Sequence, residues 1–145
     1  MSNTGIKNFT TKLAWAALCF AALAPAGAQA QPAVAQASGC ESKTNGGDLV
    51  VYSCPLVAKE AVQRYKFVAN FGGSHDDTKL SISATLNGAP VVCAPGSKAS
   101  SKYEDGDISL DCRLELKAAA GSRHLLAVKV QWYHAQLHGV QFVSE

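Results

Sequence analysis

The feature that most constrains this chain is a pair of alternating segments, each of which carries one cysteine on its apolar side. Residues 79–93 read KLSISATLNGAPVVC, in which every second side chain is apolar up to Asn87-Gly88. A period of two predicts a half-buried strand, and Asn-Gly predicts a hairpin because both residues tolerate the positive φ of a type I′ turn. A two-residue turn pairs Ile82 with Cys93, which places Cys93 on the apolar face.

The second segment, residues 107–117 (DISLDCRLELK), alternates in the same way and puts Cys112 among its apolar residues. Two inward cysteines on two amphipathic strands predict a disulfide-tied antiparallel β domain. The four cysteines beyond the first thirty residues allow three pairings. We favour Cys40–Cys54 and Cys93–Cys112, because each pair is close in sequence and the second lies on expected neighbouring strands. A four-cysteine zinc site is the alternative, but the chain has no C-x-x-C half-site.

The first thirty residues contain the three regions of a secretory signal peptide in order. Lys7 and Lys12 form the basic region, residues 13–24 the apolar region, and Ala28-Gln29-Ala30 the cleavage site. The apolar run is shorter than the roughly 20 residues of a transmembrane helix. The predicted organisation is therefore a signal peptide (1–30), a flexible N-terminal tail (31–39) and a single β-sandwich domain (40–145). This domain is expected to be periplasmic or secreted.

Two other interpretations of the N-terminal region remain open. The leader could stay uncleaved as an amphipathic anchor. Residues 37–40 (ASGC) faintly resemble a lipoprotein cleavage box, although the usual Leu at its first position is missing. Lipidation of Cys40 would leave an odd number of cysteines for disulfides.

Charge argues against two classes of partner. Two of the thirteen basic residues lie in the leader and none of the eleven acidic residues does, so the predicted mature chain has a formal net charge of zero. Nucleic-acid binding usually needs a basic stripe, and binding to anionic lipid needs a polybasic patch. We therefore expect no nucleic-acid partner and no membrane insertion after the leader is removed. No cofactor is expected either.

Alternating or β-branched runs mark the remaining strands: 49–54, 65–71, 124–133 and 140–143. We expect a turn or bulge within 134–139, and either a short helix or a loop over 56–64. The count is about six or seven strands, which favours a small antiparallel β-sandwich over a barrel. The architecture resembles immunoglobulin-like sandwiches in outline only, because Trp132 follows all four cysteines and the Cys…Trp…Cys order of those domains is absent.

The segment 94–106 (APGSKASSKYEDG) is the first candidate for a binding surface. It is long, polar and rich in Gly, Pro and Ser, so we expect an exposed loop. Exposed loops on a rigid scaffold often carry recognition residues. The expected Cys93–Cys112 bridge would hold both ends of the loop, with Tyr103 and its neighbours Lys102 and Glu104 as the contact residues. The ordinary alternative is a solvated connector.

Tyr133 is the second candidate. Alternation along 124–133 turns Trp132 inward and Tyr133 outward, and Tyr, Trp and Arg are the usual anchors of interfaces. We expect Tyr133 to share a recognition surface with Arg123, His134 and His138. The ordinary alternative is a core Trp132 beside a single tyrosine on a sheet face.

A metal site is the alternative chemistry. His134 and His138 have a spacing that could hold a metal, and His75 stands beside Asp76 and Asp77. The acid of a zinc-protease motif is missing between the two histidines. Both stretches also have the amino-acid composition that is typical of hydrophilic turns.

These patterns predict an exported, disulfide-bonded, non-enzymatic binding module, with another protein as its partner and the loop 94–106 presented as in an inhibitor or adaptor. The chain has no G-x-S-x-G elbow and no set of residues that fills the roles of nucleophile, base and orienter. Two other functions remain open. One is a small metal-binding protein that uses His134 and His138 with His75, Asp76 or Asp77. The other is a structural subunit of an envelope or surface assembly.

Overall fold

The computed structural model describes residues 39–73 and 76–145. The predicted signal peptide, all but the last residue of the predicted tail, and His75 lie outside the described residues. The strands of the described chain are β1 (Glu41–Thr44), β2 (Leu49–Val57), β3 (Val62–Gly73), β4 (Lys79–Leu86), β5 (Ala89–Val91), β6 (Ser100–Lys102), β7 (Gly106–Lys117), β8 (Arg123–Tyr133) and β9 (Ala135–Ser144). Among the described residues, no helix is long and apolar enough to cross a membrane.

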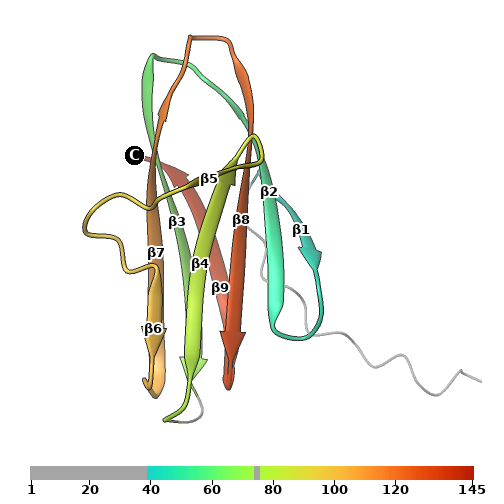
Figure 1. Cartoon of the computed structure of the whole chain (residues 1–145), viewed down its shortest axis with the longest axis vertical. Coiled ribbons are helices and arrows are strands. Elements are labelled where there is room, and N and C mark those ends of the chain that lie inside the picture. Colours follow the sequence, from blue (N-terminus) through green and yellow to red (C-terminus); the bar gives the residue numbers. More distant parts are fainter. Residues whose placement is uncertain (1–38, 74–75) are drawn as a thin grey trace, which may run out of the picture. The chain divides into compact units, whose positions relative to one another are not determined.

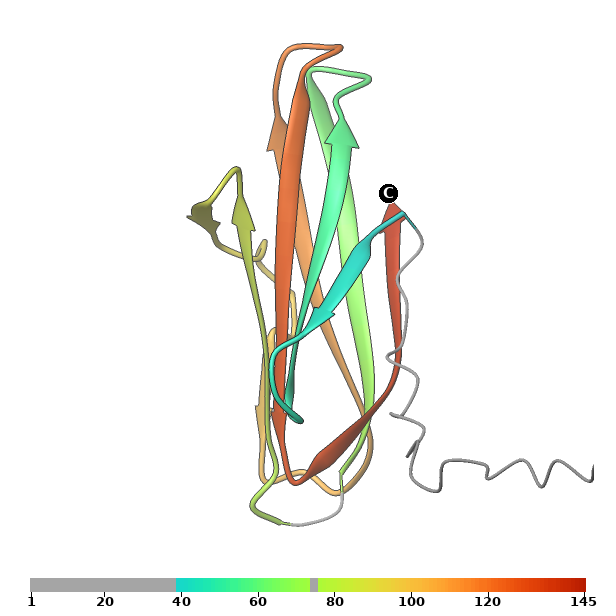
Figure 2. The same cartoon turned by 90° about the vertical axis from the view of Figure 1, so that its right-hand side faces the viewer.

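The strands form two antiparallel sheets that pack against each other, as Figures 1 and 2 show. The six-stranded sheet has the order β1-β2-β8-β4-β5, with β6 also paired to β4, and the three-stranded sheet has the order β7-β3-β9. The predicted all-β antiparallel fold is confirmed. The described chain has nine strands rather than six or seven. The prediction missed β1 and β6 because they span four and three residues inside segments rich in turn-forming residues.

The core lies between the sheets and follows the predicted alternation. Every second residue of β3, β4, β7 and β8 points inward, including Phe67 of β3 and Leu110 of β7, which are fully buried. The rings of Tyr52 and Phe67 meet across the two sheets at 5.3 Å between centroids. Trp132 also turns inward as predicted, with its ring 6.2 Å from that of Phe71.

The region 56–64 contains no helix, so that alternative is wrong. β2 runs through Pro55 to Val57, and β3 begins at Val62 after a short turn. Proline lacks the N–H that a central strand position needs. The pairing of β1 with β2 stops at Ser53, so Pro55 lies where β2 has no neighbour on that side. The missing donor therefore removes no bond to β1.

Both predicted disulfides are present. Cys40–Cys54 ties the start of β1 to β2, with an S–S distance of 2.01 Å, and Cys93–Cys112 has an S–S distance of 2.02 Å. The zinc alternative and lipidation at Cys40 are therefore wrong, because every one of these sulfurs is in a disulfide. Two disulfides indicate an oxidising compartment.

The Cys93–Cys112 bridge differs from expectation in one respect. It joins the two sheets and does not link neighbouring strands. The hairpin register is as predicted up to Val91, which pairs with Ala84, but β5 ends there. The backbone nitrogen of Ile82 donates instead to the carbonyl oxygen of Ala99. Cys93 thus leaves the sheet and crosses to β7.

Candidate functional site

The segment 94–102 is fastened along its length to the strands on both sides. The backbone nitrogens of Ala94 and Asp111 donate to the carbonyl oxygens of Arg113 and Lys98, at 2.7 and 2.8 Å. On the other side β6 pairs with β4. β7 is an edge strand of the three-stranded sheet, and covering such an edge protects it from pairing with other chains. Most residues of 94–106 are exposed as expected, but the segment is not loop throughout, because 100–102 form β6 and Ser101 is buried.

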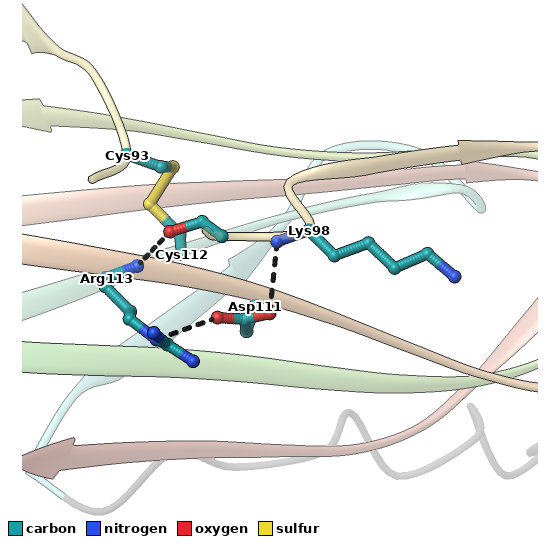
Figure 3. Close-up of polar contacts among 6 residues, drawn as sticks. Cys93, Lys98, Asp111, Cys112 and Arg113 are labelled. Carbon is teal, nitrogen blue, oxygen red and sulfur yellow. Dashed lines mark hydrogen bonds and ion pairs between the residues drawn. A yellow bond between two sulfur atoms is a disulfide. The ribbon is translucent and has the colours of Figure 1, made fainter. Parts of the chain in front are cut away.

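Polar side chains of β7 complete this attachment, as Figure 3 shows. The backbone nitrogen of Lys98 donates to Oδ1 of Asp111 at 3.1 Å, and Nε of Arg113 lies 3.4 Å from Oδ2 of the same carboxylate. The backbone nitrogen of Arg113 donates to the hydroxyl of Ser97 at 3.0 Å. The alternating polar face of β7 thus supplies acceptors and donors to a segment that has little regular structure of its own.

At the end of this segment Lys102 and Tyr103 are exposed and Glu104 is partly buried. Tyr103 has a φ of +60° and its side chain is 68% exposed. Its backbone nitrogen donates to the carbonyl oxygen of Thr78 at 2.8 Å, which fixes the backbone of the projecting residue. Lys98 Nζ donates to both oxygens of Glu104, at 3.0 and 3.1 Å. The Ser101 hydroxyl and the Lys98 ammonium hold the pKa of Glu104 below its usual value.

His134 forms a one-residue corner between β8 in one sheet and β9 in the other. Its φ is +48°, so the predicted turn is present. The buried hydroxyl of Thr78 donates to the carbonyl oxygen of His134 at 3.1 Å, and Nδ1 of His134 lies 2.6 Å from Oδ1 of Asp77. The ring of Tyr133 stacks on the ring of His134, with 4.0 Å between centroids. Asp77 and Thr78, in the loop before β4, therefore fix the position of His134, which directly follows Tyr133.

These contacts gather two exposed tyrosines at one end of the sandwich, the lower end in Figure 1. Lys79 pairs with Tyr133 on one side and with Lys102 on the other, so Lys102 and Tyr133 are two strands, or about 10 Å, apart. Lys79 Nζ lies 5.7 Å from the centre of the Tyr133 ring, within the range of a cation–π contact. We call the surface formed by 76–79, 102–104 and 133–134 the tyrosine end.

Arg123 does not belong to this surface. It begins β8 and pairs with Val57, whereas Tyr133 ends the same strand. Ten residues of extended strand separate the two by about 33 Å. The expected grouping of Arg123 with Tyr133 is wrong because the whole of 123–133 is one strand, which places its ends at opposite ends of the domain.

The candidate metal ligands are distributed over two places. His134 contacts Asp77, and Asp76 adjoins that pair in sequence. His138 is the extra residue of a bulge in β9 where the register against β3 shifts, and its ring covers Gly72, where an added Cβ would lie 2.6 Å from Cε1. Over residues 39–73 and 76–145 no group of three or more His, Cys, Asp or Glu side chains is placed to hold a metal ion.

A set of lysines lies on the outer face of the six-stranded sheet and was not predicted from the sequence. Their partners in the strand register show that they share this face: Lys43, Lys79, Lys102 and Lys129. The parity of Lys79 and Lys129 in their strands could have indicated this. Lys43 and Lys102 could not, because their short strands were not predicted. Net charge concealed the set, since acidic residues elsewhere cancel it.

Comparison of the chain with protein-family models, with curated proteins and with solved structures gives no significant match. The small disulfide-bonded all-β domain is compatible with an exported binding module. The identification of a function therefore depends on the geometry of its surfaces.

Proposed function

We propose that the protein is an exported, non-enzymatic module that binds another protein through the tyrosine end. The observation that carries this proposal is the presence of two exposed tyrosines, Tyr103 and Tyr133, at one end of the sandwich. Tyrosine gives a large amphipathic contact area with few rotatable bonds, and it is enriched among the residues that dominate binding energy.

The backbone around both rings is held before any partner arrives. The backbone nitrogen of Tyr103 donates a hydrogen bond to the carbonyl oxygen of Thr78. The ring of Tyr133 stacks on His134, whose carbonyl oxygen accepts a hydrogen bond from the Thr78 hydroxyl. Ordering a flexible loop on binding costs free energy that a preformed surface does not. Lys102 and Glu104 flank Tyr103 and supply the polar rim that protein interfaces have. In the inhibitor or adaptor version of this function, the presented part is 102–104 and not all of 94–106.

Export is supported by two independent features. The N-terminal thirty residues have the pattern of a secretory signal peptide, and the domain carries two disulfides, which persist in the periplasm and outside the cell. The two features together support a periplasmic or secreted location.

The experiment is a quantitative pull-down with mature protein as bait, from periplasmic or host extract, followed by affinity measurement with the captured protein. The variant is Tyr103→Ser with Tyr133→Ser, and the matched control is Val92→Ser, an exposed apolar residue outside the tyrosine end. If each tyrosine is an anchor worth about 2 kcal/mol, the double variant binds roughly 1,000-fold more weakly. Equal binding by the double variant and the control would contradict the proposal.

A metal-dependent function is the second candidate, and it would use His134 and Asp77, whose side chains are hydrogen-bonded to each other at 2.6 Å. Metal analysis of the mature protein decides between them. Stoichiometric zinc or copper that is lost on His134→Ala would replace the binding-module proposal as stated. Large ordered oligomers in solution would favour the third function, a surface-assembly subunit.

A further inference from the structure

We infer that the outer face of the six-stranded sheet binds an acidic polysaccharide. This face borders the tyrosine end and shares Lys79 and Lys102 with it, but the inference concerns another class of partner. The lysine face, as we call it, consists of four lysines and the small polar residues between them: Lys43, Lys79, Lys102, Lys129, Ser81, Ser83, Ser100 and Gln131.

The strand register arranges these residues in three parallel rows. The first row contains Lys79 and Lys102 beside Tyr133, and the third contains Lys43, Lys129 and Ser83. The middle row contains Gln131, Ser81 and Ser100, with Leu49 beside Gln131. From strand geometry, Lys79 and Lys129 are about 14 Å apart and Lys43 and Lys129 are about 10 Å apart. The positive charges thus lie at the borders of a polar sheet surface.

No ion pair within the described residues neutralises the four lysines of this face. On the outer face of the three-stranded sheet, by contrast, Arg64 and Lys117 both contact Glu115. Glu41 is the one acidic residue on the described strands of the lysine face, opposite Ser53.

One pair of lysines is placed unfavourably for stability. Lys79 and Lys102 are direct cross-strand partners, and like charges in this position destabilise a sheet. A protein tends to violate such a local rule where a site requires it. A carboxylate or sulfate bound between the two ammonium groups would replace this repulsion with attraction.

The composition of the face favours a hydrated acidic glycan over other anionic partners. Hydroxyl and amide groups between the lysines match the hydroxyl groups of sugars, and Tyr133 at the border offers one aromatic ring. The centre of a protein interface is apolar and depleted in Lys and Ser. A single-stranded nucleic acid is usually held by several stacking rings. Insertion into a lipid surface needs exposed apolar side chains, and the aliphatic residues of the three rows, Leu49 and Val51, are half-buried.

The test uses affinity chromatography and calorimetry of the mature protein with heparin and polygalacturonate as acidic polysaccharides and dextran as the neutral one. The face variant is Lys43→Gln with Lys129→Gln, whose sites lie away from the tyrosine end. The control variant is Lys59→Gln with Lys66→Gln, which removes the same charge elsewhere. We expect the face variant to bind acidic polysaccharide roughly tenfold more weakly and with a shallower salt dependence, and the control to differ less than twofold.

Several results would overturn the inference. These are equal losses in both variants, no binding of wild type to either acidic polysaccharide, or stronger binding to a single-stranded DNA or to phosphatidylglycerol vesicles than to the polysaccharides. The Tyr103→Ser, Tyr133→Ser variant keeps all four lysines, so it should retain most of its heparin binding, which separates glycan binding from the protein binding proposed for the two tyrosines. Thermal unfolding of Lys102→Gln is a further readout. The substitution should raise the melting temperature because it removes the repulsion from Lys79 and leaves the contact of Lys79 with Tyr133 in place, and a lowered melting temperature would contradict the repulsion.

Discussion

The Cys93–Cys112 disulfide can be removed without adding a charge or a bulky group, by combining Cys93→Ala with Cys112→Ala. This bridge joins the two sheets and encloses the segment 94–102. Its removal therefore affects the unfolded chain, which gains freedom, and the folded one, in which the crossing between sheets loses its covalent tie.

The magnitude follows from the length of chain that the bridge closes. The cysteines are 19 residues apart, for which the loop-entropy relation gives about 3 kcal/mol of lost stability at 25 °C. Cys40–Cys54, with a separation of 14, gives nearly the same value of about 3 kcal/mol. The two bridges therefore differ mainly in where the structure loosens. The first should release the backbone bonds of Lys98, Ala99 and Asp111, and the second those of β1.

Urea unfolding at 25 °C measures the loss, and amide exchange locates it. With an m-value of about 1.2 kcal/mol/M, the midpoint of the Cys93→Ala, Cys112→Ala variant should fall by roughly 2.5 M. Exchange should accelerate at the amides of Ile82, Lys98 and Asp111, and the Cys40→Ala, Cys54→Ala control should leave them protected. A midpoint within about 0.5 M of wild type, or unchanged exchange at these three amides, would refute the assignment of this bridge as the tie between the sheets.

Three further outcomes are expected. Burial raises the pKa of Tyr52 to about 12, so an absorbance titration should show one tyrosine that ionises at higher pH than the others. In the unfolded chain the same tyrosine ionises near pH 10. The stabilisation that this difference provides should therefore be complete below pH 10 and disappear as the pH rises to 12. Contact with Lys117, and secondarily with Arg64, lowers the pKa of Glu115, so the carboxyl pKa measured by NMR should rise on Lys117→Gln. The stabilisation by this ion pair is present above the pKa of the unfolded chain and is lost as the pH falls through the lowered pKa of the folded chain. An unchanged pKa of Glu115 in the variant would contradict the pairing. Asp111→Ala removes the acceptor of the Lys98 nitrogen and should destabilise the domain by about 1 kcal/mol in urea, with faster exchange at that amide; unchanged exchange would show that the bond is not formed in solution.

The core and the disulfides could be predicted because their signals are local. Alternation along 65–71 identifies Phe67 and Phe71 as inward residues whatever their partners are, and the pattern survives in the structure. The pairing of the cysteines followed from their closeness in sequence. The pairing of whole strands has no such local signal, which is why the prediction placed Cys93 and Cys112 on neighbouring strands.

The candidate site was predicted in pieces and not as a whole. Tyr103 and Tyr133 were each singled out, yet only the register of β4 with β6 and β8 brings them to one end. The segment before Tyr103 was expected to project because its composition is that of a loop. The acceptor and hydroxyl contacts that hold it involve Asp111 and Arg113, which belong to another strand and give no signal in the segment itself.

The most direct test of the central claim is site-specific photo-crosslinking in cells that export the protein. A photoreactive phenylalanine analogue replaces Tyr103 or Tyr133 at the tyrosine end, or Val92 as the exposed control. We expect the same cross-linked partner protein from positions 103 and 133 and none from position 92. Cross-linking from 92 alone, or the absence of any partner at 103 and 133, would contradict this expectation.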